Sequence, residues 1–247
     1  MRTGGSVKSE TKVGRLDLRL RARQLLGVAL GFSQCDPRTL DALVAGGNLR
    51  TLGKGEALTR RGEPFDMLSL IVDGSLEASH VRHDGHRHLV SFAQPGDVLG
   101  MISLLDGLGH VNDLHARGGS TTVLVIPGQV VRECRKHDPE LGHAFELQLA
   151  FRSRLLYERL ASDPSLPLES RVARLLQALA GLYGRKGPHG IALEMRISQA
   201  DLGDWLGVSR QRANFAVQQL RDANLISVRY SAITITDPEG LSVRAMT

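Results

Sequence analysis

The chain has 247 residues, 42% of them hydrophobic, and a formal net charge of +5. This length allows one large domain or two ordinary ones, and the mild basicity suits a nucleic-acid partner without requiring one. With two cysteines, the chain cannot build a disulfide framework or a four-cysteine cluster. It has no apolar run long enough to span a membrane and no secretion-signal core, so we expect a cytoplasmic protein.

The N-terminal residues are polar and mixed in charge, and we assign residues 1–20 to a flexible tail. Leucines recur at helical spacing among arginines and predict an amphipathic helix over residues 15–30. Asp36 is a good N-cap and Pro37 suits a first helical position, which predicts a short helix over 37–44.

Short apolar stretches broken by glycines run from residue 49 to about 127. Val72-Asp73-Gly74 and His83-Asp84-Gly85 are typical of hairpin turns. Strands are predicted at 68–72, 76–81, 88–92 and 122–126. About eight such strands indicate a small antiparallel barrel or jelly roll, and we assign residues 21–137 to this domain.

Four histidines gather around the predicted turn at residues 83–85: His80, His83, His86 and His88. Neutral imidazole binds metals and haem, so a metal or haem sensor is one interpretation. A solvated hairpin tip is the simpler one, and we assign no metal ligand.

Cys35 and Cys134 are alternative sensor candidates. Cys134 lies among Arg132, Arg135 and Lys136, whose charges would favour a reactive thiolate. A structural or incidental role is the favoured interpretation of both cysteines.

The longest predicted helix runs from residue 138 to 160, within an assigned segment of 138–162. Its apolar residues form two stripes. One holds Phe145, Leu149, Leu156 and Leu160, and the other holds Ala144, Leu147, Phe151 and Leu155. Two stripes indicate burial from two sides, for instance against the barrel and against a second copy of the helix. Burial inside one large domain would produce the same pattern.

Residues 163–247 form the last predicted domain, after a hinge-like break at 162–165. An amphipathic helix over 168–182, a loop over 184–190 and a short strand over 191–195 open it. Alternating segments at 225–228 and 232–236 predict a hairpin that closes it.

Between them, residues 197–220 predict two short helices joined by a tight turn. Ser198 with Asp201 is a variant capping box, Gly207 suits a left-handed helix end, and Ser209 caps the second helix. Gly203 is small where the two helices must cross.

The second helix has two faces. Ala213, Ala216 and Leu220 form a packing face. Another arc carries side chains that match the hydrogen-bonding edges of guanine and adenine. It holds Arg210, Asn214, Gln218 and Arg221, with Gln211 and Phe215 beside it. A plain helical hairpin with a solvated polar face is the alternative.

This order resembles the Crp/Fnr family of bacterial transcription regulators from about residue 25 to the end. The segments GVSRQRANFAVQQL and NLISVRYSAITI resemble the recognition helix and wing. The barrel resembles the family through Gly55-Glu56, Arg61-Gly62-Glu63, Ile71-Val72-Asp73-Gly74 and residues 95–100. The resemblance implies an α+β protein with a cyclic-nucleotide-binding-like β-roll, a dimerisation helix and a C-terminal winged helix-turn-helix.

The same resemblance implies a homodimer on a pseudo-palindromic operator, with RNA polymerase as a further partner if the protein activates. Arg210 takes a guanine-contacting role, and we expect Gln211 and Asn214 to contact bases. Gln211 and Phe215 depart from the family's frequent glutamate and arginine, which predicts a different operator, and Phe215 suits a thymine methyl group. Ser209, Arg212 and Tyr230 are candidates for phosphate contacts.

The effector region, residues Gly96–Arg117, departs further from the family. Members that bind cyclic AMP carry a glutamate where Met101 stands, and an arginine beside serine or threonine near Asn112 and Asp113. Losing the arginine removes the main anchor for a phosphate, and Asp113 would repel one. Arg117 is expected in the following strand. We therefore do not expect cyclic AMP to bind in the usual way, and we assign no cofactor.

Two alternatives stay open for the regulator: constitutive, effector-independent DNA binding, and a response to haem, metal or redox state. A cupin-like enzyme is the least favoured hypothesis, because no carboxylate follows His86-Arg87-His88 at the spacing that cupins use. We predict no catalytic residue.

Overall fold

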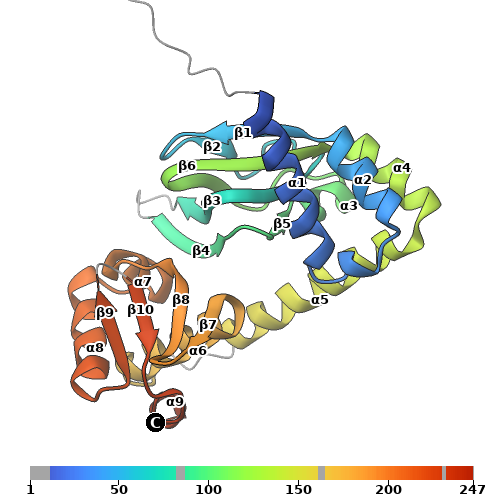
Figure 1. Ribbon diagram of the computed structural model, residues 1–247. Coiled ribbons are helices and arrows are strands. Elements are labelled where there is room, and N and C mark those ends of the chain that lie inside the picture. Colours follow the sequence, from blue (N-terminus) through green and yellow to red (C-terminus); the bar gives the residue numbers. More distant parts are fainter. Residues whose placement is uncertain (1–11, 82–86, 161–164, 230–231, 247) are drawn as a thin grey trace, which may run out of the picture. The chain divides into compact units, whose positions relative to one another are not determined.

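The computed structural model describes residues 12–81, 87–160, 165–229 and 232–246 (Figure 1). It divides into two compact units, one of residues 1–79 with 91–150 and one of 80–90 with 151–247. The division therefore falls within the long helix rather than at both its ends. Among the described residues, no helix combines the length and the apolar character needed to cross a membrane.

The first unit contains a six-stranded sheet in the order β1-β6-β3-β4, with β2 paired to β6 and β5 paired to β3. Its strands are β1 (Asn48–Leu52), β2 (Ala57–Thr59), β3 (Met67–Val81), β4 (Arg87–Ala93), β5 (Val98–Leu99) and β6 (Asp113–Pro127). The expected β-roll is confirmed, but it is built around two strands of 15 residues each rather than eight short ones.

The predicted turn at Val72-Asp73-Gly74 is wrong, because β3 runs through it. The register against β6 shifts between Ile71 and Asp73 and again between Asp73 and Ser75. Gly74 has a φ of 78°, and a Cβ there would lie 2.6 Å from the Ser120 carbonyl oxygen. The glycine therefore marks an irregularity that bends a continuous strand. The turn predicted at residues 83–85 lies outside the described residues.

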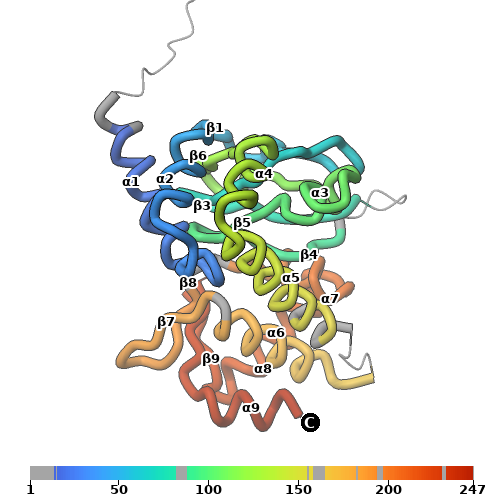
Figure 2. Tube along the Cα trace, turned by 90° about the vertical axis from the view of Figure 1, so that its right-hand side faces the viewer, coloured from blue at the N-terminus to red at the C-terminus, as the bar shows by residue number. Residues whose placement is uncertain are grey.

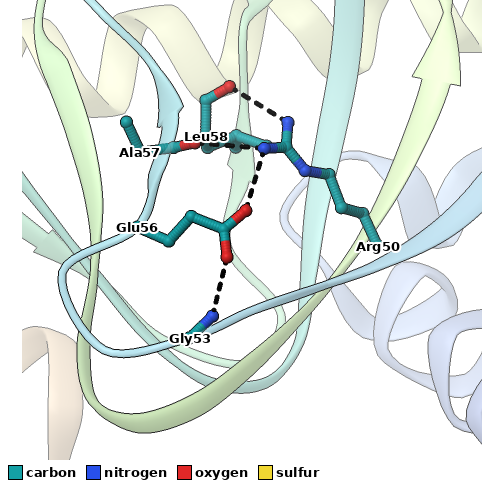
Figure 3. Close-up of polar contacts among 5 residues, drawn as sticks. All are labelled: Arg50, Gly53, Glu56, Ala57 and Leu58. Carbon is teal, nitrogen blue, oxygen red and sulfur yellow. Dashed lines mark hydrogen bonds and ion pairs between the residues drawn. The ribbon is translucent and has the colours of Figure 1, made fainter. Parts of the chain in front are cut away.

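Arg50 and Glu56 hold the turn between β1 and β2 (Figure 3). One Arg50 nitrogen donates to the Glu56 carboxylate at 3.2 Å and to the Ala57 carbonyl at 3.2 Å, and the other donates to the Leu58 carbonyl at 3.4 Å. Glu56 also accepts from the Gly53 N–H at 3.0 Å, which together with Arg50 lowers the pKa of its carboxyl group. The Gly55-Glu56 motif thus has a structural role in this turn.

Helices pack against the sheet to complete the first unit: α1 (Lys12–Val28), the 3-10 turn η1 (Phe32–Gln34), α2 (Pro37–Gly46), α3 (Met101–Asp106), α4 (Gly128–His137) and the start of α5 (Pro139–Leu160). Figure 2 shows α1 and α3 on opposite sides of this unit. The core joins α1, α2, α4 and α5 to β3 and β6 through residues such as Leu26, Leu43, Leu70 and Phe145. Residues 12–20, which we expected within a tail, lie in α1.

The second unit contains α6 (Leu168–Tyr183), β7 (Gly184–Gly187), β8 (Gly190–Arg196), α7 (Gln199–Leu206), α8 (Arg210–Asp222), β9 (Ile226–Arg229), β10 (Ala232–Ile235) and α9 (Pro238–Met246). Its four strands are ordered β7-β8-β10-β9. Figure 1 shows α8 beside β9, with β7 at the other edge of the sheet. The loop predicted over 184–190 is wrong in part, because residues 184–187 pair with β8.

Candidate DNA-binding surface and sensor

The helix-turn-helix begins with a reciprocal cap on α7. The Ser198 hydroxyl oxygen accepts from the Asp201 N–H at 3.2 Å, and the Asp201 carboxylate accepts from the Ser198 N–H at 2.8 Å. The Ser198 hydroxyl also donates to that carboxylate at 2.6 Å. The predicted capping box is therefore confirmed, and it satisfies two backbone donors at the start of α7 that the helix itself leaves without a partner.

The turn between α7 and α8 depends on two glycines. Gly207 is left-handed with a φ of 69°, and its N–H donates to the Gly203 carbonyl. A Cβ on Gly203 would lie 2.8 Å from the Val208 carbonyl oxygen and 3.3 Å from the Arg210 nitrogen. The small residue expected at the crossing is thus required, and α8 starts directly against α7.

Helix α8 is capped at its start and buried along one side. The Ser209 hydroxyl accepts from the Arg212 N–H at 3.3 Å and caps it. Ala213, Ala216, Val217 and Leu220 are all less than 5% exposed. The predicted packing face is confirmed, with Val217 added, and the remaining residues of α8 are exposed to solvent.

Among the exposed residues, Arg210, Gln211, Asn214 and Phe215 lie on the first half of α8. Gln218 lies further along and is already engaged: its amide nitrogen donates to Asp222 at 2.8 Å, and its oxygen accepts from Arg221 at 3.1 Å. The i,i+3 and i,i+4 spacing of these residues is the sequence signal that makes such pairs possible, although it does not single them out. The side chains of the first half are therefore the better candidates for base contacts.

The predicted hairpin after α8 is confirmed as β9 and β10, which pair from Ile226↔Ile235 to Arg229↔Ala232. Asn224 precedes it with a φ of 58°, and the Thr236 hydroxyl donates to the Asn224 carbonyl at 2.7 Å. This bond ties the end of β10 to the end of α8. Tyr230, a predicted phosphate contact, lies outside the described residues.

In the effector region, Met101, Asp113 and Arg117 all make contacts within the first unit. Met101 is 3% exposed and belongs to the core of the first unit. The Asp113 carboxylate accepts from the Arg61 N–H at 2.9 Å. Arg117 lies in β6, opposite Ser75, and its guanidinium covers the Phe92 ring at 4.4 Å.

The loop between α3 and β6 is fastened to the loop before β3. The Gly62 N–H donates to the His110 carbonyl at 2.8 Å, and the His110 N–H donates to the Glu63 carbonyl at 2.9 Å. The His110 ring packs edge-on against Phe65 at 5.2 Å, and its Nδ1 lies 2.7 Å from the Asn112 carbonyl oxygen. Burial is the main cause that lowers the pKa of His110.

Neither cysteine has the environment of a reactive thiol. Burial raises the pKa of Cys35 to about 11, and the charges of Asp138 and Glu140 add to the shift. Burial also raises the pKa of Cys134, followed by the charges of Asp138 and Glu133. The cations that flank Cys134 in sequence therefore do not produce the lowered pKa that a redox sensor needs.

The histidine cluster is only partly within the described residues, since His83 and His86 lie outside them. His80 and His88 are half-buried on β3 and β4. Among the residues that the structure describes, no group of three or more histidine, cysteine or acidic side chains could hold a metal ion.

The candidate dimerisation residues occupy different environments along α5. Phe145 is 1% exposed and packs against Phe32, with ring centroids 6.2 Å apart. Leu149 is half-buried, and Leu156 is 53% exposed. The side chain of Leu160 is outside the described part of the structure. Phe145 thus belongs to the core of its own unit and has no surface to offer a partner.

Comparison with protein families matches residues 49–138 to the cyclic nucleotide-binding domain and residues 170–244 to the Crp-like helix-turn-helix domain. Together with the fold, these matches define the class of the protein: a DNA-binding transcription regulator with a cyclic-nucleotide-binding-type domain ahead of its helix-turn-helix. These two domains in this order are those of the Crp/Fnr family, and the chain belongs to that family.

Three similar proteins illustrate the relationship. The global nitrogen regulator of Synechococcus elongatus is 25% identical over 193 residues, which cover 76% of this chain and 86% of the relative. The CRP-like cAMP-activated global transcriptional regulator of Mycobacterium tuberculosis is 23% identical over 227 residues, which cover 90% of this chain and 99% of the relative. The structure of FixK2 from Bradyrhizobium japonicum aligns with a TM-score of 0.70 at 20% identity, covering 80% of this chain and 96% of that one.

Proposed function

We propose that the protein is a homodimeric, sequence-specific regulator that places α8 in the major groove of a pseudo-palindromic operator. The observation that carries this proposal is the capped helix α8, which is buried on one stripe and exposes Arg210, Gln211 and Asn214 on its first half. Helix-turn-helix proteins contact base edges with the N-terminal residues of this helix. Arginine suits guanine, and glutamine or asparagine suits adenine.

The candidate phosphate contacts lie at the edge of the same surface. Ser209 and Arg212 are exposed at the start of α8, next to the base-contacting residues. We retain Tyr230 as a candidate from the sequence alone. Phosphate contacts supply most of the non-specific affinity and make it fall steeply with salt.

The dimer contact would lie on the second half of α5. The first turns of this helix are buried in their own unit through Ala144 and Phe145, which are at most 1% exposed. Beyond Leu149, the helix exposes 39% of Phe151, 53% of Leu156 and 70% of Tyr157. A second copy of the helix would cover this apolar surface, as two packed helices do in a symmetric dimer.

The sensor would not bind cyclic AMP in the usual way. Met101 is buried in the core, and the Arg117 guanidinium stacks on the Phe92 ring. The Asp113 carboxylate accepts a hydrogen bond from the Arg61 N–H. Met101 and Asp113 carry no positive charge for a phosphate, and the guanidinium of Arg117 already stacks on Phe92. The relative from Mycobacterium is named as cAMP-activated, and we propose that this chain binds its operator without that activation.

Two measurements on the full-length protein test the proposal. Sedimentation equilibrium should give a dimer, and fluorescence anisotropy should show selective binding to an operator obtained from randomised duplexes. Adding cyclic AMP should leave the operator Kd unchanged. A monomer in sedimentation, or equal affinity for all duplexes in anisotropy, would contradict the proposal of a sequence-specific homodimer. A lower operator Kd in the presence of cyclic AMP would contradict only the sensor proposal.

A further inference from the structure

Phe215 is an aromatic side chain on the surface of the recognition helix. It is 67% exposed, whereas its neighbours Ala213 and Ala216 are buried at 0% and 1% exposure. An isolated phenyl ring in water gives up the burial that normally stabilises it. What distinguishes it from other exposed apolar side chains is its place among the polar residues of α8 that are candidates for base contacts.

The position of Phe215 aligns it with a candidate base-contacting residue. Gln211, Phe215 and Gln219 are spaced four residues apart, so they form one stripe along α8. All three line an open groove of about 630 Å³ between α8 and the start of α6. Pro167 and Leu168 form the apolar part of the opposite wall.

The charge around this stripe suits DNA. Arg210 and Arg212 are exposed on α8 on either side of Gln211. The acidic residue in the groove, Glu169, is 17% exposed at its side chain and accepts from Arg244 at 2.6 Å. Its charge is therefore paired inside the domain and does not oppose an approaching phosphate.

A phenyl ring has no hydrogen bond to offer a base edge. The 5-methyl group of thymine is the apolar group that the major groove presents among the base edges. Resting on the proposed function, we infer that Phe215 is a specificity-determining residue that contacts a thymine methyl group in the operator. Gln211, one turn before it, contacts an adenine close by, so this part of each half-site is A·T rather than G·C.

The test removes the methyl group alone. In an operator selected with the full-length protein, each thymine of one half-site is replaced in turn by deoxyuridine, and the Kd is measured by anisotropy at fixed salt. One replacement should weaken wild-type binding about fourfold, the equivalent of one buried methyl group. The same replacement should have no effect on Phe215→Ala.

Gln219→Ala is the matched control, because Gln219 lines the same groove one turn after Phe215, in the second half of α8 and beyond the candidate base contacts. It should keep the full deoxyuridine effect at the same position. If deoxyuridine at every thymine leaves wild-type binding unchanged, or weakens Phe215→Ala equally, the inference is wrong while the proposed function stands. If the wild type selects no sequence at all, the proposed function fails and the inference fails with it.

Discussion

Replacing Arg210 by alanine should reduce the selectivity of the protein more than its stability. Arg210 is the first residue of α8, and its exposed side chain follows the Ser209 cap. Surface substitutions of this kind change the free energy of unfolding by about 0.5 kcal/mol or less. A bidentate arginine–guanine contact, in contrast, discriminates between bases by about 1–3 kcal/mol. The predicted loss is therefore about five- to 140-fold in Kd for each half-site.

The assay compares the selected operator with variants changed at a single base pair, using wild type, Arg210→Ala and Arg210→Lys. Lysine keeps the charge but loses the planar pair of donors, so it should retain non-specific affinity while relaxing the same base position. Thermal unfolding checks that the fold is retained. If Arg210→Ala keeps the wild-type preference at every position, Arg210 does not contact a base, and the proposed orientation of α8 is wrong.

Four further predictions concern other parts of the chain. Arg212→Ala should weaken binding to all duplexes alike. It should reduce the slope of log K against log salt by about 2, because a homodimer loses one phosphate contact in each half-site, whereas an altered base preference would assign Arg212 to direct base contact. Ser198→Ala should lower the free energy of unfolding by about 0.5–2 kcal/mol, because α7 loses its reciprocal cap, and denaturant unfolding would show no change if the cap were dispensable. Leu156→Glu should shift the protein from dimer to monomer in sedimentation. Val28, 78% exposed on α1, provides the control, since Val28→Glu should leave the dimer intact. If Leu156→Glu remains a dimer, the dimer contact is not at Leu156. Burial lowers the pKa of His110 below 6.5, so the unfolded chain gains a proton first as the pH falls. The stability supplied by the neutral ring is thus complete above about pH 6.5 and decreases below it, and His110→Gln should remove this part of the pH dependence of Tm.

The helix-turn-helix was predictable because its signals are local. Ser198, Gly207 and Ser209 each act within a few residues of their own position, and the packing stripe of α8 follows from helical periodicity. The engaged state of Gln218 was missed although its partners are one turn away, because the sequence does not say which of several polar neighbours a side chain will bond.

The barrel was harder to predict, because long-range pairing overrides local turn signals. Asp73-Gly74 has the composition of a hairpin turn, but β6 pairs on both sides of it and keeps β3 continuous. Residues 184–187 contain glycines at both ends and still form a strand, because β8 provides a partner edge. Pairing partners far away in sequence leave no local trace.

The sensor and dimer residues show the same limit. The cations beside Cys134 in sequence suggest a reactive thiol, but burial and Asp138, which also contacts the Asp36 N–H, raise its pKa. Phe145 shares a stripe with Leu156 by periodicity, yet only Phe145 faces Phe32. Tertiary contacts decide such roles, and periodicity alone cannot distinguish a helix face that packs within its own unit from one that meets a partner.

The central claim is that two copies of α8 bind one symmetric DNA site. The most direct measurement is selection of binding sites by the full-length protein from randomised duplexes, followed by sequencing of the bound pool. The bound pool should share an inverted repeat whose half-sites are centred about 10–10.5 base pairs apart, one turn of DNA. A pool without a shared motif, or a motif consisting of a single asymmetric half-site, would contradict it.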